Sequence, residues 1–110
     1  MRTSTSAIVA RNETWTGKAA TEPYEAGWAK EVIIFVRSLK MPEGPGGRAR
    51  VEISPDGLHW VPEGTEIALP SEKNGVTFAR IAHFGTWLRL AAELPDKSSN
   101  TVLVTLHLKS

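Results

Sequence analysis

The sequence predicts an all-β fold, an antiparallel β-sandwich or jelly roll of about seven or eight strands. Three observations support this prediction. Apolar residues mostly recur at every second position, which is the period of a strand with one buried face. Turn-forming residues interrupt the chain at short intervals, and all seven prolines lie in or beside these breaks. Helical patterns are scarce, so the chain lacks the crossover helices that parallel strands need.

The segments with a strand pattern are joined by short connections. The clearest is 101–109, where every second residue from Val102 to Leu108 is apolar and lies on one face. The run 32–36 is apolar at every position, which predicts a central strand covered on both faces. The predicted strands are 6–12, 30–39, 48–53, 64–69, 76–83, 86–93 and 101–109.

A hairpin is predicted where the strand 48–53 meets a group of turn residues. Pro55 has the φ angle required at the first central position of a type I turn, and Asp56 suits the second. Gly57 then supplies the left-handed residue of a bulged loop of about three residues. The alternation on the strand predicts a buried face and a solvated face, formed by Ala49, Val51 and Ile53 and by Arg48, Arg50 and Glu52 respectively.

Two segments are less regular than the strands. Residues 12–29 predict a long connection that serves as a binding loop or an arm. Within it several helix formers occur, but Pro23 and Gly27 favour a loop or a single turn. Residues 44–47, Gly-Pro-Gly-Gly, predict a flexible tip, because they lack the Lys-Ser/Thr pair of a phosphate-binding loop.

The composition fits a single β-sandwich domain covering residues 1–110. Thirteen basic and twelve acidic residues give a net charge of +1, which argues against nucleic acid or an anionic membrane as a partner. Cysteine is absent, which excludes disulfides and thiolate ligands. No apolar run is long enough for a signal peptide or a membrane span. We therefore expect synthesis in the cytoplasm without a signal peptide.

The sequence carries no recognisable catalytic motif. The three histidines, His59, His83 and His107, lack the spacing of a metal-binding pair. No serine lies in a Gly-x-Ser-x-Gly elbow, and both aspartates fall in turns that favour this residue. We therefore predict a protein that is not an enzyme and that needs neither a metal nor a cofactor. A hydrolase or isomerase site assembled from distant loops is the open alternative.

Aromatic residues are the strongest candidates for a binding site. Four tryptophans and one tyrosine form a rich set for this length, and aromatic faces stack on sugars or anchor protein partners. The alternative is that the tryptophans fill the ends of the sandwich. Trp87 alternates with the core residue Leu88, which predicts that it is partly exposed or covered by a neighbouring chain. The candidate binding residues are Trp15, Tyr24, Trp28, His59, Trp60, Trp87 and Arg89.

Arginines are spread over several predicted strands and alternate with glutamates. They would form one basic stripe only if the strand order brought them together. Because charges on alternating strand positions usually face water, a solvated face is the better prediction. The residues concerned are Arg37, Arg48, Arg50, Arg80 and Arg89.

The segment from Ser54 to Trp60, Ser-Pro-Asp-Gly-Leu-His-Trp, resembles the S-x-D-G-x-x-W hairpin of discoidin-like and other galactose-binding-type β-sandwiches. It is also similar to the sialidase Asp-box. That box has a residue between its aspartate and its glycine, whereas Asp56 and Gly57 are adjacent here and the motif occurs once. The sialidase interpretation is therefore rejected. The remaining resemblance implies a jelly-roll or discoidin-like β-sandwich.

The layout of the whole chain resembles small all-β virion structural proteins of tailed bacteriophages. The resemblance is carried by a Ser/Thr-rich start, the segment 26–29, the apolar strand 32–36, the hairpin ending in Trp60, and the segment 84–90 before a closing alternating strand. It implies a non-enzymatic structural or assembly protein of a capsid or tail. Its partners would be proteins, either copies of itself in a homo-oligomer or other particle subunits, contacted through Trp87 and residues 12–29.

A carbohydrate-binding module is the second functional expectation. In that case Trp15, Trp28 or Trp60 would stack on a glycan, and nearby polar residues would orient it. The two expectations differ in the ligand they require, a protein surface or a sugar.

Overall fold

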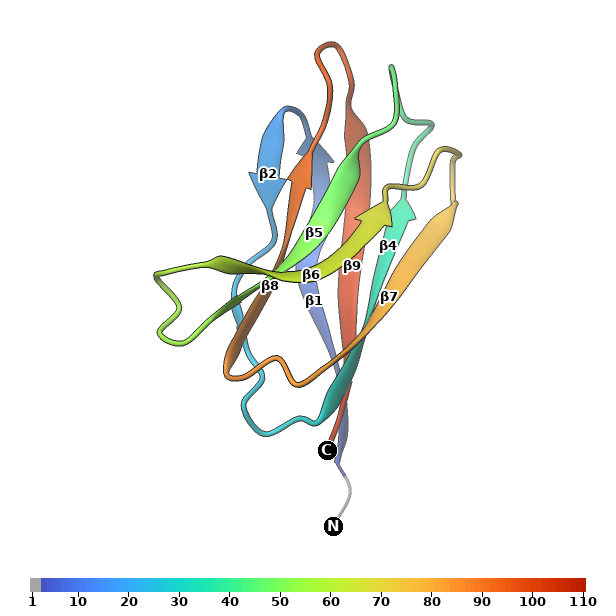
Figure 1. The fold of residues 1–110 in the computed structure, drawn as a ribbon. Coiled ribbons are helices and arrows are strands. Elements are labelled where there is room, and N and C mark those ends of the chain that lie inside the picture. Colours follow the sequence, from blue (N-terminus) through green and yellow to red (C-terminus); the bar gives the residue numbers. More distant parts are fainter. Residues whose placement is uncertain (1–2) are drawn as a thin grey trace.

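The structure is a computed structural model that describes residues 3–110. These residues form nine β-strands and no helix (Figure 1). The predicted all-β class is therefore confirmed. The strands are β1 (Ser4–Trp15), β2 (Lys18–Ala20), β3 (Tyr24–Glu25), β4 (Glu31–Ser38), β5 (Arg48–Ser54), β6 (Val61–Ala68), β7 (Val76–Ala82), β8 (Trp87–Glu93) and β9 (Asn100–Lys109).

The strands lie in two antiparallel sheets that pack against each other. One sheet has the order β1-β9-β4-β7, and the other has the order β2-β8-β5-β6, with the short β3 also paired to β8. Both inner faces contribute apolar side chains to one core, as a sandwich requires. The predicted antiparallel β-sandwich is therefore confirmed.

The chain folds as one long hairpin that is rolled up. Starting from the tip of this hairpin, β5 pairs with β6, β4 with β7, β2 and β3 with β8, and β1 with β9. The roll brings β4 against β9 and β5 against β8, which completes the two sheets. This nested pairing is the jelly-roll arrangement. It places the loop after β5 at the tip of the hairpin.

The core is built from alternate positions of the strands. On β9 the side chains of Val102, Val104, Leu106 and Leu108 are all buried, as the alternation predicts. The strand β4 lies between β9 and β7, so its predicted central position is also confirmed. Its inward residues are buried, whereas Ile33 and Phe35 on the opposite face are only half-buried. The prediction of cover on both faces is therefore wrong, because a second layer packs on only one of them.

The segment 12–29 is more ordered than the sequence suggests. The first strand continues to Trp15, with register shifts against β9 on either side of Ala10, and Asn12 has a φ of 50°. Further on, β2 and β3 both pair with β8. Between them, Thr21 exchanges hydrogen bonds with Leu90, whose backbone N–H donates to the threonine hydroxyl at 3.0 Å. The expected free loop or arm is thus a pair of short strands held at the sheet.

The hairpin between β5 and β6 differs from the prediction in its length. Ile53 pairs with Val61, so the intervening loop is longer than the expected three-residue turn. Gly57 has a φ of 79°, as predicted for a left-handed residue. The loop is longer because side chains, rather than a tight turn, bind its backbone groups, as described below.

The glycine-rich segment 44–47 packs against another loop instead of standing free. Glu43 forms a β-bridge with Ser99, and the Ser98 hydroxyl donates to the carbonyl of Pro45 at 2.7 Å. Gly44 has a φ of 75°, and a Cβ there would lie 2.5 Å from the carbonyl oxygen of Lys97. The close approach of the two loops therefore depends on a glycine at this position.

The two ends of the described chain lie together. Ser4 pairs with Lys109, and the backbone N–H of Thr3 donates to the Ser110 hydroxyl at 2.7 Å. Both ends leave the sandwich at the same pole (Figure 1). Among residues 3–110 there is no helix long and apolar enough to cross a bilayer.

Candidate functional site

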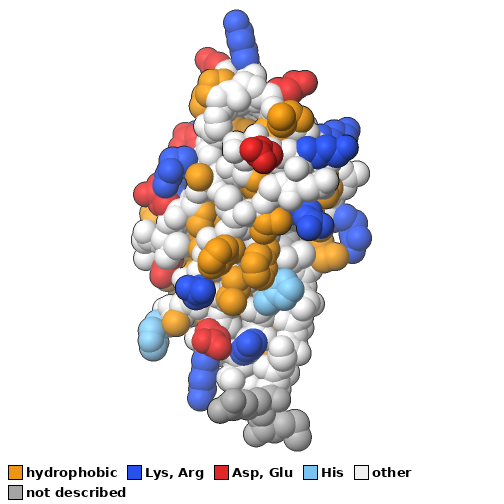
Figure 2. All heavy atoms as spheres, turned by 90° about the vertical axis from the view of Figure 1, so that its right-hand side faces the viewer, with side chains coloured by type: hydrophobic (Ala, Val, Ile, Leu, Met, Phe, Trp, Pro, Cys, Tyr) orange, Lys and Arg blue, Asp and Glu red, His pale blue; other side chains and the backbone are white. Residues whose placement is uncertain are grey.

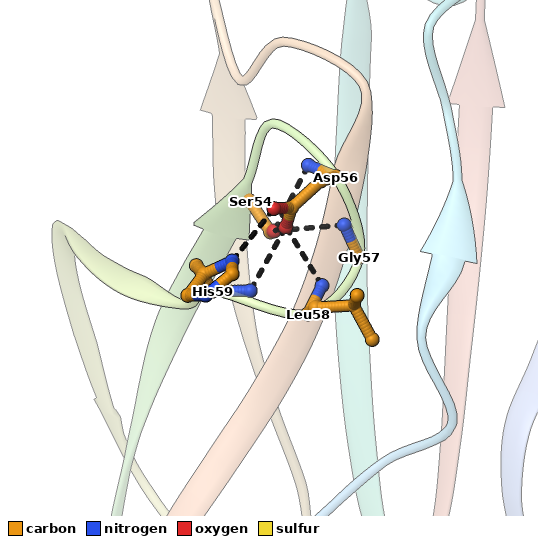
Figure 3. Close-up of polar contacts among 5 residues, drawn as sticks. All are labelled: Ser54, Asp56, Gly57, Leu58 and His59. Carbon is orange, nitrogen blue, oxygen red and sulfur yellow. Dashed lines mark hydrogen bonds and ion pairs between the residues drawn. The ribbon is translucent and has the colours of Figure 1, made fainter.

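The loop from Ser54 to Trp60 is held by two of its own side chains. The Ser54 hydroxyl accepts the backbone N–H groups of Asp56 and Gly57 at 3.2 and 2.9 Å (Figure 3). The Asp56 carboxylate accepts those of Leu58 and His59 at 2.8 and 2.9 Å. Four backbone donors that have no strand partner are thereby satisfied within the loop, which fixes its shape.

Asp56 is also the electrostatic centre of this loop. Hydrogen bonds from the backbone of His59 and Leu58, and then from the His59 side chain, hold the pKa of Asp56 well below its usual range. The imidazole Nδ1 of His59 lies 2.6 Å from the carboxylate. The Ser54 hydroxyl donates to this carboxylate at 2.9 Å rather than to the imidazole, and Ser54 is buried. The three side chains therefore brace the loop, and they do not form the nucleophile–base pair that acyl transfer requires.

Two tryptophans lie on the outer face of the five-stranded sheet, Trp60 at the end of the loop and Trp87 at the start of β8. A Cβ at Gly57 would lie 3.2 Å from the Trp87 ring, so the loop backbone covers that ring closely. The Arg89 guanidinium lies over the Trp60 ring, 4.3 Å from its centroid, in a cation–π contact. Trp87 is half-buried and therefore partly exposed, which is one of the two predicted outcomes, and the cover that it has comes from this chain's own loop.

A charged network continues from Trp60 along this face. Arg89 binds Glu52 through two nitrogens at 2.7 Å, and Arg50 Nε lies 3.0 Å from the other carboxylate oxygen. Burial of Glu52 opposes its ionisation, but hydrogen bonds from Arg89 and then Arg50 outweigh this and lower the pKa of Glu52. The sequence predicts a solvated Glu52, whereas its exposure is only 5%. The residue does point outward, but the two arginines cover it.

A shallow groove of about 370 Å³ lies beside the network and crosses β2, β8 and β5. Ala20 and Ala91 are opposite one another in the register and line the groove, and because their side chains are small, the space above them stays open. Lys18, Arg50 and Glu93 border it with both signs of charge. We call this groove, together with Trp60, Trp87 and Arg89, the loop site.

The structure gathers part of the predicted set of binding residues. Trp60, Trp87 and Arg89 lie at the loop site, although they come from two separate segments of the chain, whereas the His59 side chain contacts Asp56 within the loop. Trp15 is 3% exposed and belongs to the core, so it offers almost no surface to a ligand. Tyr24 on β3 also packs against the core.

Trp28 stands apart from these core residues. It is 40% exposed and lies in the connection before β4.

Arginines of the five-stranded sheet lie close to glutamates of neighbouring strands. Arg48 lies 3.7 Å from Glu66, and Arg50 lies 3.9 Å from Glu93. Arg37 and Arg80 are on the other sheet, so the strand order does not join the arginines into one basic stripe. Within residues 3–110 no group of three acidic or histidine side chains is placed to hold a metal ion.

A second surface was not foreseen from the sequence. It lies on the outer face of the four-stranded sheet and consists of Ile33 and Phe35 of β4, Val76 and Phe78 of β7, and Leu103 of β9, which we call the apolar patch. The side chains of Val76 and Phe78 are 47% and 49% exposed. Figure 2 shows hydrophobic side chains gathered in the middle of this face, with charged groups around them.

Aromatic rings contact one another within and beside the apolar patch. Phe35 lies beside Phe78 in the register, with ring centroids 6.0 Å apart, and His107 meets Phe35 edge-on at 5.0 Å. The Arg80 guanidinium lies 5.3 Å from the centroid of the Phe78 ring.

The sequence signal for this surface was the pair of apolar residues in 32–36 that fall on the non-core face of the strand, Ile33 and Phe35. They indicate a covered outer face or an open one equally well.

Opposite charges stand at the two ends of the apolar patch along β4. Glu31 precedes Ile33 and Phe35, and Arg37 follows them, with all four side chains on the same face of the strand. The acidic residue, the two apolar residues and the basic residue therefore follow one another along a single strand.

These features define a jelly-roll β-sandwich with a braced loop on one face and an apolar patch on the other. No family model and no curated protein matches the chain. Among solved structures, the crystal structure of the SPBc2 prophage-derived protein YomS is similar in fold, with a TM-score of 0.66 and 10% sequence identity. The similarity covers 100% of this chain and 96% of that chain. A protein of prophage origin thus shares this fold, in line with the expected resemblance to phage proteins. Similarity to discoidin-like domains stays a prediction.

Proposed function

We propose that this protein is a structural or assembly component of a phage or phage-derived particle, and that it acts through protein–protein contacts rather than catalysis. The apolar patch is the observation that carries the proposal. Phe78 and Val76 are about half exposed and lie in one group with Phe35, Ile33 and Leu103. Contiguous apolar surface of this kind, bordered by charged residues, is typical of protein contact sites.

Two further observations support the proposal. The fold is shared along the whole chain with a protein of prophage origin. The Ser54, Asp56 and His59 side chains are engaged in hydrogen bonds within the loop. Both observations fit a protein whose surfaces are contacted rather than one that turns over a substrate.

The test is to look for the chain in particles. Phage or prophage particles from a host that carries the gene are purified on a density gradient, and the chain is measured by quantitative mass spectrometry. We expect it to sediment with particles or with their capsid or tail intermediates in a fixed ratio to the major subunits. Its absence from particles and from all intermediates, while it is expressed in the same cells, would overturn the proposal.

Carbohydrate binding is a second candidate, and the loop site favours it. Trp60 lies beside an alanine-lined groove whose borders carry Arg50, Arg89 and Glu93, a combination that suits a sugar ring and its hydroxyl groups. A glycan array followed by tryptophan fluorescence titration tests this. A glycan response that is lost in Trp60→Ala and kept in Trp28→Ala supports the candidate, and the lack of any response removes it.

A further inference from the structure

We propose that the apolar patch binds a second copy of this chain in a two-fold symmetric dimer, in which β4 of one protomer lies antiparallel across β4 of its partner. The inference rests on the proposed function and deepens it, because it names the partner of the protein contact. The two outer sheet faces would stack with the angle of about 30° that is common between packed sheets.

The charge order along β4 is self-complementary. Outward residues of this strand run Glu31, Ile33, Phe35, Arg37. If a two-fold axis crosses the strand between Ile33 and Phe35, each residue faces the one at the mirror position of the other copy. Glu31 then faces the partner's Arg37, and Ile33 faces the partner's Phe35. One strand thus supplies two ion pairs at the ends of an apolar centre, as an isologous interface requires.

The central residues of the neighbouring strands agree with the same axis, whereas at the ends Lys109, beside Glu31, faces the partner's Leu103. The register places Arg80 beside Ile33 and Phe78 beside Phe35, so across the axis Arg80 faces the partner's Phe78. A guanidinium already lies over that ring within one chain, which shows that the two groups pack well. On β9, His107 lies beside Ile33 and Thr105 beside Phe35, so these two polar groups face each other.

The alternative two-fold axis is unfavourable. An axis that runs along β4 would place each residue of this strand against its own copy. Arg37 would then face the partner's Arg37, and Glu31 the partner's Glu31. Like charges in direct opposition are destabilising, so the charge order selects the antiparallel crossing of the two strands.

Charge reversal tests the inference, because the two single variants are complementary to each other. In Glu31→Arg alone, and in Arg37→Glu alone, each interface holds two like-charge contacts. When equal amounts of the two variants are mixed, a heterodimer regains both opposite-charge contacts. Sedimentation velocity ultracentrifugation over a wide concentration range, at low salt, measures the assembly of each sample.

We expect a dimer for the natural sequence and a weakening of the dissociation constant by about tenfold or more in each single variant. The mixture is expected to return to within about threefold of the natural affinity, and the double variant Glu31→Arg/Arg37→Glu likewise. Glu25→Arg, an exposed position on the other sheet, is the matched control and should leave the dimer unchanged.

Several outcomes would overturn the inference. They are a natural protein that stays monomeric at every concentration, a larger open assembly, or single variants that dimerise as well as the natural chain. If a charge variant fails to fold by circular dichroism, Phe78→Ser replaces it, and a dimer that persists in this variant also contradicts the interface. A monomer that nevertheless sediments with particles would refute this inference while leaving the proposed function standing.

Discussion

Asp56 and Ser54 accept the backbone hydrogen bonds that would otherwise have to be satisfied within a tight turn. Their oxygens bind four consecutive backbone N–H groups, from Asp56 to His59, in a loop that has no strand partner. The loop can therefore be long and still have one shape. This shape brings Gly57 against Trp87, so that the loop covers one part of the loop site.

The first prediction concerns the charge of Asp56. Asp56→Asn should lower the melting temperature at pH 7, because a neutral amide accepts the same N–H groups more weakly. The folded pKa of this carboxyl is depressed, so its stabilisation is present above its ordinary pKa of 3.8 and is lost as the pH falls below that value. Melting curves from pH 7 to pH 2 should therefore show a difference that narrows on acidification.

Asp96→Asn is the control for this measurement, since Asp96 is the other aspartate and lies exposed in a loop. It should change the melting temperature little at any pH. A gap between the natural protein and Asp56→Asn that stays constant down to pH 2 would contradict the role given to the carboxylate.

The second prediction concerns the buried carboxylate of Glu52. Glu52→Gln should destabilise the protein by about 1–2 kcal/mol, because the anionic acceptor of Arg89 and Arg50 becomes a neutral amide while both arginines keep their charge. Glu66→Gln, whose exposed carboxylate lies 3.7 Å from Arg48, should change stability by less than about 0.5 kcal/mol. Urea denaturation of both variants measures the contrast, and equal effects would argue against the network.

At the scale of elements, two loops far apart in the sequence depend on each other. The segment 44–47 and the loop after β8 are joined by the Glu43–Ser99 bridge and by the Ser98 hydroxyl on Pro45. Their contact closes one end of the sandwich. Only the absence of a side chain at Gly44 lets the two backbones approach this closely.

The third prediction uses the glycines of this contact. Gly44→Ala should destabilise the protein by about 2 kcal/mol or more, because it combines a positive φ with a Cβ placed 2.5 Å from the Lys97 carbonyl. Gly46→Ala should have an effect within about 0.5 kcal/mol, since nothing lies within 4 Å of its Cβ position. Chemical denaturation of the two variants provides the comparison. A tolerated Gly44→Ala would mean that the two loops separate easily.

The elements that the sequence predicts are those whose own side chains carry the pattern. In β9 alternate apolar residues meet the core directly, so a period of two is visible. The short strands β2 and β3 are held mainly by backbone pairing with β8, which leaves no such pattern. Their existence follows from the position of β8, which lies far away along the chain.

The candidate site was predictable to a similar extent. A hairpin with Asp56, Gly57 and Trp60 was recognisable because turn chemistry is local. Its contact with Arg89 was not, since it depends on which strand lies beside β5. The outer face of β4 gave an ambiguous signal, because Ile33 and Phe35 look alike whether a second layer covers them or not.

At the scale of the whole molecule, the rolled hairpin makes folding depend on distant contacts. The outermost pair joins β1 to β9 across nearly the entire chain, for example Ser4 with Lys109. Among the strands of residues 3–110, only the innermost pair, β5 with β6, is local. The hairpin tip can form early, whereas the outer pairs must wait for long loops to close.

The fourth prediction follows from the non-local pairing of the outer strands. Refolding should take from about 10 milliseconds to seconds, in the slow range of all-β domains with non-local pairing. Stopped-flow tryptophan fluorescence after dilution from urea measures it, and the buried Trp15 at the end of β1 provides a reporter. Refolding in microseconds would show that the outer strands do not limit the rate.

The pairing of the first strand, β1, with the last strand, β9, also determines how the protein responds to a mechanical load. Because β1 and β9 are antiparallel and their free ends emerge at the same pole, a tension applied between those ends acts across the ladder and not along it. The bonds from Ser4–Lys109 inward are then loaded one after another, as in a zipper. Pulled by its two ends, the protein should open at low force, whereas tension between the start of β4 and the start of β9, which lie at opposite poles, shears a whole row of bonds at once.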